Sequence, residues 1–216
     1  MSNRQPRRRD SSRTSIGAVA TKRFWRWFKE HLQEIEAGYD ADRVVKEIDR
    51  HVRSLGPFTW EIGPGRDKEF SFVLSPGGNA SLVNMCRRVV SRAPIFASWE
   101  LHSSKPPKDW SYKFSFLLTD GNEIAVDATL WRYRLLRYTD SATLDIDICA
   151  PALTTLCKRD QTTAAEIVLD SVLGEAGRLE AIGRIEVFER LDGEGVGIPI
   201  QYLAAHVMEL TGRAPF

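Results

Sequence analysis

The chain has 216 residues, of which 43% are hydrophobic and 27% are charged. This apolar fraction is far above that of disordered chains, so the sequence can build a substantial core. No apolar run reaches the roughly 18 residues of a membrane span, and we predict none. The three cysteines (Cys86, Cys149 and Cys157) match no zinc or redox spacing. We interpret them as free thiols in a reducing compartment, and we expect a cytoplasmic protein without metal or cofactor.

The net charge is only +1, but it is unevenly distributed. Residues 1–23 carry seven basic side chains against Asp10 alone, which leaves the rest of the chain mildly acidic. An acidic body argues against a nucleic-acid-binding fold, so contact with nucleic acid is expected only through the Arg-rich tail. Residues 1–21 are polar and rich in Ser and Thr, and we predict that they are disordered. Because transit peptides share this composition, a targeting role for the tail stays open.

Apolar side chains at helical spacing predict helices near both ends of the chain. We expect a helical pair within residues 22–56, formed by helices over 22–36 and 41–54 and ended by Gly56-Pro57. Further helices are expected after Asn79, from the capping-box pattern at Thr163, and over residues 198–211 at the C-terminus.

Within residues 57–190 the apolar period changes to two, which is typical of strands. The Asp120-Gly121-Asn122 turn predicts a hairpin, and a three-residue loop would place Phe116 opposite Val126. A tight turn at 139–142 would place Arg134 opposite Asp147.

The order of these elements lacks regular strand–helix alternation. It therefore predicts an α+β fold with a mostly antiparallel sheet and helices packed on one face. We expect a single domain over residues 22–216, consisting of the helical segment, the sheet with its helices over 57–190, and the C-terminal helix.

The chemically most varied exposed stretch begins with Glu100 and His102, which share one strand face. A histidine beside a carboxylate can act as a general base, and Asp127 is a third candidate catalytic residue. The alternative interpretation is a solvated strand face. The four histidines lie on different predicted elements and show no metal-ligand spacing, so we predict no metal site.

The glycine-containing turn of residues 75–79 joins a predicted strand to a predicted helix. Backbone N–H groups at such a turn can bind an anion. Ser75, Gly77, Gly78 and Asn79 are therefore candidate ligand-binding residues, although no P-loop motif follows. The alternative is a tight turn in which Asn79 caps the helix.

Two further groups of residues are open to a functional interpretation. Asp145 and Asp147, with Asp127, could hold a divalent cation, but cross-strand ion pairs are the competing explanation. The aromatic segment of residues 24–28 interleaves basic side chains with large rings. Its Trp25, Trp27 and Phe28 are candidate partner-binding residues at a membrane surface or in a partner groove, unless the helix docks on its own sheet.

No catalytic constellation is evident, so the leading hypothesis is a non-catalytic protein-binding or regulatory module. One alternative is a small-molecule enzyme with its site on the open sheet face near Glu100 and His102. A weaker alternative is contact with nucleic acid through the Arg-rich tail. The oligomeric state does not follow from the sequence.

Overall fold

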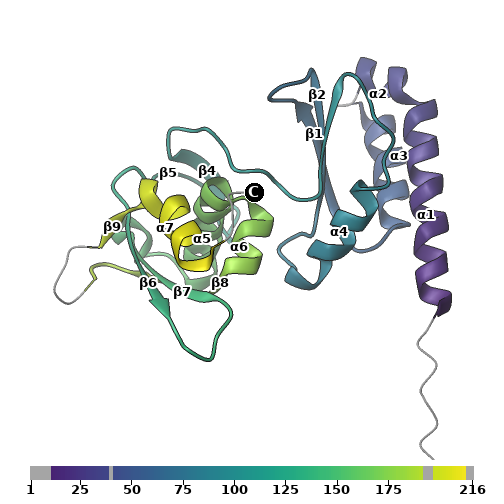
Figure 1. Cartoon of the computed structure of the whole chain (residues 1–216). Helices are drawn as coiled ribbons and strands as arrows, with labels where there is room; N and C mark the ends of the chain where they lie inside the picture. The colour runs from purple at the N-terminus through teal and green to yellow at the C-terminus, as the bar shows by residue number, and fades with distance from the viewer. Residues whose placement is uncertain (1–10, 39–40, 192–196, 213–216) are drawn as a thin grey trace, which may run out of the picture. The chain divides into compact units, whose positions relative to one another are not determined.

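The computed structural model describes residues 11–38, 41–191 and 197–212 (Figure 1). The α-helices are α1 (Ser11–Glu30), α2 (Leu32–Gly38), α3 (Asp42–Arg53), α4 (Val83–Val90), α5 (Lys158–Leu173), α6 (Glu175–Ala181) and α7 (Leu203–Thr211). The short 3₁₀ helices are η1 (Ala80–Leu82), η2 (Pro151–Leu153) and η3 (Ile200–Tyr202). The strands are β1 (Thr59–Pro64), β2 (Phe70–Ser75), β3 (Trp99–His102), β4 (Lys113–Leu117), β5 (Glu123–Asp127), β6 (Arg132–Arg137), β7 (Leu144–Cys149), β8 (Ile182–Phe188) and β9 (Ile198–Pro199). Most strand pairs are antiparallel, which confirms the predicted α+β class.

The chain forms two compact units where we expected one domain from residue 22. The first unit extends to Ser103, except for Gly78–Ala80, and the second contains those three residues and the chain from Ser104 onward. Each unit has its own cluster of buried hydrophobic side chains. The N-terminal helices pack on the first sheet and form one core with it, whereas the two sheets of the second unit share the other core.

The first unit packs its N-terminal helices against a three-stranded sheet. Its strand order is β1-β2-β3, with β1 antiparallel and β3 parallel to the central β2. Phe24 and Phe28 of α1 are fully buried and contact Phe72 of β2, with ring centroids 5.7 and 5.4 Å apart. Figure 1 shows α1, α2 and α3 together on one side of this sheet. The aromatic segment therefore holds α1 on the sheet.

Helix α1 begins at Ser11, so the predicted disorder of residues 1–21 is wrong from residue 11 onward. Residues 1–10 lie outside the described part of the chain. Once the aromatic turns are anchored, each residue added at the N-terminal end gains a backbone hydrogen bond without a new nucleus. The Thr21 hydroxyl also donates to the Gly17 carbonyl oxygen (2.8 Å). The packing of the aromatic residues on the sheet therefore stabilises the helix back to Ser11, although the residues before Thr21 have few apolar side chains at helical spacing.

The predicted helical pair of residues 22–56 is formed by three helices. Helices α1 and α2 are separated only at His31. The His31 N–H still donates to the Trp27 carbonyl, and the His31 carbonyl accepts the N–H of Ile35. The predicted C-terminal helix over 198–211 also begins later. Ile198–Pro199 form β9, because they pair with Arg132 and Tyr133 of β6. The next three residues form η3, and α7 follows.

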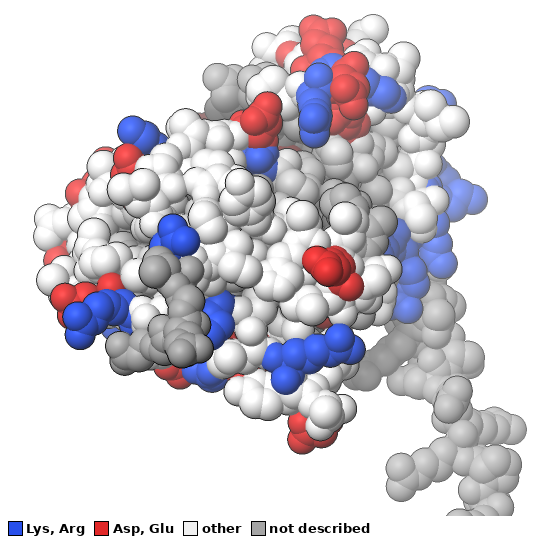
Figure 2. Space-filling model, turned by 60° about the vertical axis from the view of Figure 1, so that its left-hand side comes forward, with Lys and Arg blue, Asp and Glu red and all other residues white. Residues whose placement is uncertain are grey.

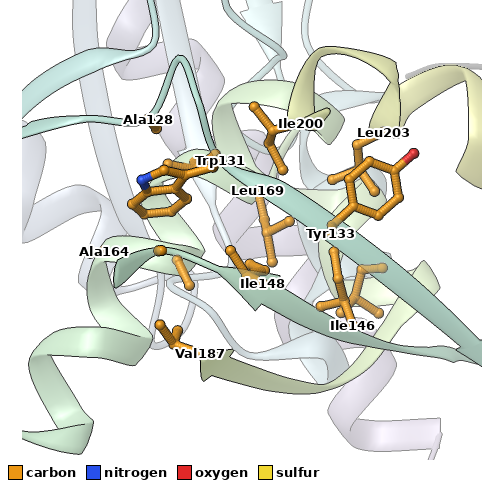
Figure 3. Close-up of a cluster of buried hydrophobic side chains, with 14 of the residues drawn as sticks. Ala128, Trp131, Tyr133, Ile146, Ile148, Ala164, Leu169, Val187, Ile200 and Leu203 are labelled. Carbon is orange, nitrogen blue, oxygen red and sulfur yellow. The ribbon is translucent and has the colours of Figure 1, made fainter. Parts of the chain in front are cut away.

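The second unit contains a two-stranded sheet (β4-β5) and a four-stranded sheet in the order β8-β7-β6-β9. Tyr133, Ile146 and Ile148 of the larger sheet are fully buried, and they gather with Leu169 of α5 and Leu203 of α7 (Figure 3). Helices α5 and α7 thus supply the other half of this core. The β6–β7 register pairs Arg134 with Asp147, as the tight turn at 139–142 predicted.

The β4–β5 register differs from the prediction by two residues. Phe116 lies opposite Ile124 rather than Val126, so the apolar side chains keep a common face while the pairing shifts. The loop has three residues, as expected, but it spans 119–121, because Leu118 pairs with Asn122.

A tertiary contact explains the position of this loop. The backbone N–H and the hydroxyl of Thr119 both donate to the carboxylate of Asp160 in α5, at 3.0 and 3.1 Å. Asp160 is almost fully buried. Because a buried carboxylate needs donors, Thr119 is held in the loop and cannot join the strand.

Candidate functional site

Glu100 and His102 lie on β3 in the first unit, on the strand face that the sequence predicted. Nε2 of His102 is 3.2 Å from Oε2 of Glu100, and their side chains are 30% and 13% exposed. The other carboxylate oxygen, Oε1, accepts hydrogen bonds from the backbone N–H groups of Asp67 and Lys68, the latter at 2.7 Å. Glu100 therefore supplies the acceptor for the turn between β1 and β2.

This environment favours the ionised form of Glu100. Hydrogen bonds from the backbone of Asp67 and Lys68 lower the pKa of the carboxyl group, and His102 lowers it further. The turn also packs tightly, since a Cβ on Gly65 would lie 2.9 Å from Oε1. A carboxylate whose oxygens already accept three hydrogen bonds is better suited to stabilising the turn than to accepting a proton from substrate.

Replacing Glu100 with glutamine is expected to destabilise the first unit at neutral pH by weakening the hydrogen bonds to the turn. Because folding lowers the Glu100 pKa, its stabilising contribution is complete above the ordinary value of 4.5 and is lost as pH falls through the folded-state value. Urea unfolding of the wild type and Glu100→Gln should therefore differ most near neutral pH and converge in acid. An equal difference at every pH would contradict this role.

Asp127, the third candidate catalytic residue, belongs to the second unit. Its Oδ1 accepts hydrogen bonds from the hydroxyl (2.5 Å) and the backbone N–H (3.0 Å) of Thr129, and its Oδ2 lies 3.1 Å from Nζ of Lys113. The Thr129 hydroxyl and amide, with Lys113, lower the Asp127 pKa to about 2. Its partners thus make it a turn residue with an exposed cross-strand ion pair.

In the predicted anion-binding turn, Ser75 ends β2 and is fully buried. Its Oγ accepts the N–H of Gly77 (3.0 Å), and Gly77 has a positive φ of 61° that favours glycine. Asn79 directly precedes η1. These contacts account for a tight turn between the strand and the helix.

The turn does present an amide to a carboxylate, but the carboxylate comes from the chain itself. Oε1 of Glu175 accepts the N–H of Gly78 (3.0 Å), and Oε2 accepts the N–H of Lys105 (3.3 Å). Glu175 is 2% exposed. An internal anion therefore occupies the position that we considered for a ligand.

The aspartates of β7 are bound by arginines. Oδ2 of Asp147 lies 2.8 Å from Nη2 of Arg134, which confirms the ion-pair interpretation for this residue. Asp145 accepts hydrogen bonds from the backbone N–H and Nε of Arg184, both at 3.0 Å, and these lower the Asp145 pKa. The face thus carries a network of ion pairs.

The three candidate partner-binding aromatic residues lie mainly inside the first unit. Phe28 is fully buried, and Trp25 is 3% exposed with its Nε1–H donating to the Val89 carbonyl (2.8 Å). Trp27 is half-buried and stacks on His31 and His51, with ring centroids 5.1 and 4.1 Å away. The helix docks on its own sheet, so these rings are structural, and α1 presents its polar side chains outward.

That outward face borders a surface depression that the sequence did not reveal, which we call the α1–α4 groove. One hollow of about 650 Å³ is lined by Ala18, Lys22, Trp25, Arg26, Lys29, Arg92, Ala93 and Pro94. A second, of about 310 Å³, is lined by Gly17, Ala18, Thr21, Leu55, Met85, Arg88, Val89 and Arg92. The hollows share Ala18 and Arg92, so they are adjoining parts of one surface.

The charged side chains that line the α1–α4 groove are all basic. They are Lys22, Arg26, Lys29, Arg88 and Arg92. All five residues are exposed, and within the described part of the chain none of them forms an ion pair. Figure 2 shows blue side chains gathered along the right-hand side of the view without red between them. An unneutralised basic surface of this kind attracts anions.

Part of the groove was open to sequence reasoning. Lys22, Arg26 and Lys29 recur at helical spacing on the predicted first helix, so the sequence alone could have indicated a basic helix face. Arg88 and Arg92 come from α4 and the residues after it. Only the packing of α4 beside α1, through the Trp25–Val89 hydrogen bond, brings the two sets together.

Comparisons with models of protein families, with curated proteins and with solved structures found no match to this chain. None of the described helices is both long and apolar enough to span a membrane. Among the described residues, no three His, Cys, Asp or Glu side chains gather in a way that could hold a metal ion.

Proposed function

We propose that the protein is a non-catalytic binding module, and that the α1–α4 groove binds an anionic segment of a partner. The observation that carries this proposal is the set of five exposed cations around the groove, none paired within the described residues. A negatively charged partner associates faster and more specifically with such a surface, because the two charges are complementary.

The distribution of charge between the units supports the same function. The first unit has 18 Lys and Arg against 12 Asp and Glu, whereas the second has 12 against 17. Residues 1–10 contribute four of the first unit's basic side chains and one of its acidic side chains, so the rest of that unit has 14 against 11, and this smaller excess comes from α1. An enzyme built on Glu100 and His102 has less support, because Glu100 serves as the acceptor for its turn.

The proposal predicts that the full chain binds a fluorescent oligoglutamate peptide, and that binding weakens as salt rises because surface charges are screened. Arg26→Glu combined with Arg92→Glu should weaken binding by at least about tenfold, since two attractive contacts become repulsive. Fluorescence anisotropy at several salt concentrations measures both effects.

The matched control is Arg137→Glu combined with Arg159→Glu in the second unit, which changes the net charge equally at exposed positions. It should retain almost all of the wild-type affinity. Equal losses in the two double variants would show that only net charge matters, and would contradict a recognition surface at the groove.

A further inference from the structure

The floor of the larger hollow is apolar although its sides are cationic. Ala18 and Trp25 of α1 meet Ala93 and Pro94 of the segment after α4. The Trp25 ring lies beneath this lining with 3% of its surface exposed, so Ala18, Ala93 and Pro94 supply most of the apolar surface. The next residue after Pro94, Ile95, is 98% exposed. A ligand in this hollow therefore meets a preformed apolar surface between positive charges.

The lining residues of α1 follow the helix axis. Ala18, Lys22, Trp25 and Lys29 are spaced by three or four positions, so they form one line along three turns. Eleven residues of helix rise roughly 16 Å. The small side chains of Gly17 and Ala18 leave open space, and a Cβ on Gly17 would have no atom within 4 Å. A second rod-shaped segment can therefore approach the α1 backbone closely.

We infer that the occupant of the α1–α4 groove is an amphipathic acidic helix of a partner protein, with apolar side chains on the floor and carboxylates beside the cations. This inference rests on the proposed function and specifies the chemistry of the partner. Helices that bind in grooves present apolar anchors at spacings of three and four residues, and such anchors can lie on Ala18, Ala93 and Pro94. Carboxylates flanking those anchors complement Lys22, Arg26, Lys29 and Arg92.

Other anionic macromolecules fit this surface less well. A phosphodiester backbone would satisfy the cations but leave the apolar floor uncovered. An anionic lipid surface would contact the cations without needing apolar anchors at helical spacing. An acidic helix covers both kinds of surface at once.

The test compares two peptides of about 16 residues and equal composition. In one, leucines recur at i, i+3, i+4 and i+7 among glutamates, and in the other the same residues are arranged without this period. We expect the full chain to bind the amphipathic peptide at least about tenfold more tightly by fluorescence anisotropy. A single-stranded DNA oligonucleotide and phosphatidylserine vesicles serve as competing probes.

A variant of the floor separates this inference from the charge effect. Ala18→Gln places a longer polar side chain where the two hollows meet, and should remove the preference for the amphipathic peptide. The matched control, Ala37→Gln, makes the same change at an exposed helical position outside the groove and should keep that preference.

The outcomes distinguish the inference from the proposed function. Equal affinity for both peptides, or tighter binding of DNA or vesicles that still depends on Arg26 and Arg92, would overturn the acidic helix and leave an anion-binding groove standing. If no anionic probe responds to Arg26→Glu with Arg92→Glu, both proposals are wrong.

Discussion

Phe28→Ala is expected to destabilise the first unit by about 3–5 kcal/mol, which is the usual cost of removing a fully buried phenylalanine ring. Phe28 has no exposed surface and contacts four aromatic rings other than its helical neighbour Phe24. Those rings are Trp25, Phe72, Phe96 and Trp99, with centroids 5.2 to 5.7 Å away. Because they belong to several elements, they cannot all move into the cavity, and most of the packing energy is lost.

Urea unfolding gives the change in the free energy of unfolding, and amide hydrogen exchange locates it within the chain. We expect faster exchange in α1, β2 and α4, whose residues share this core. Arg23→Ala is the matched control, since Arg23 is exposed on the same helix. A loss of less than about 1 kcal/mol for Phe28→Ala would show that the aromatic cluster does not hold α1 on the sheet.

Arg178→Met is expected to destabilise the second unit by about 2–3 kcal/mol, because it breaks the ion pair of a buried guanidinium group with the partly buried carboxylate of Asp170 and leaves that carboxylate without a counter-charge. The Arg178 side chain is 8% exposed. Its Nε lies 2.5 Å from Oδ1 of Asp170, and its Nη1 lies 3.1 Å from Oε1 of Glu166. Methionine keeps most of the aliphatic volume, so the expected loss is mainly electrostatic.

The loss should depend on pH. Burial raises the Asp170 pKa, and Arg178 offsets part of that rise. Without the guanidinium group the folded-state pKa rises further, so ionised Asp170 costs more stability at neutral pH than in acid. The destabilisation of Arg178→Met should therefore shrink as pH falls toward the raised pKa.

Adding Asp170→Asn to Arg178→Met should recover part of the stability, because the uncompensated carboxylate is removed. Arg159→Met, at an exposed position of the same helix as Asp170, is the control for loss of a positive charge. Urea unfolding at several pH values measures all of these variants. No recovery in the double variant would show that the loss comes from packing rather than from the buried charge.

Some of the contacts of the candidate site residues follow from the sequence, and others do not. Sequence spacing correctly placed Glu100 and His102 on one strand face and Arg134 opposite Asp147, because both relations depend on strand periodicity and a tight turn. It could not show that Glu100 accepts hydrogen bonds from Asp67 and Lys68, more than 30 positions away. Nor could it show that Glu175 binds the Gly78 amide. Such contacts bring together residues that are distant in the chain.

The sequence by itself determined the α+β class and most strand and helix positions, because these follow from local apolar periods and turn residues. The tertiary structure decided the division into two units, the β4–β5 register that Asp160 sets through Thr119, and the burial of Trp25 and Phe28. It also decided the pairing of α1 with α4 that forms the basic groove. The physical reason is that local spacing sets which side chains share a face, whereas long-range packing selects the face that is covered and the face that stays exposed.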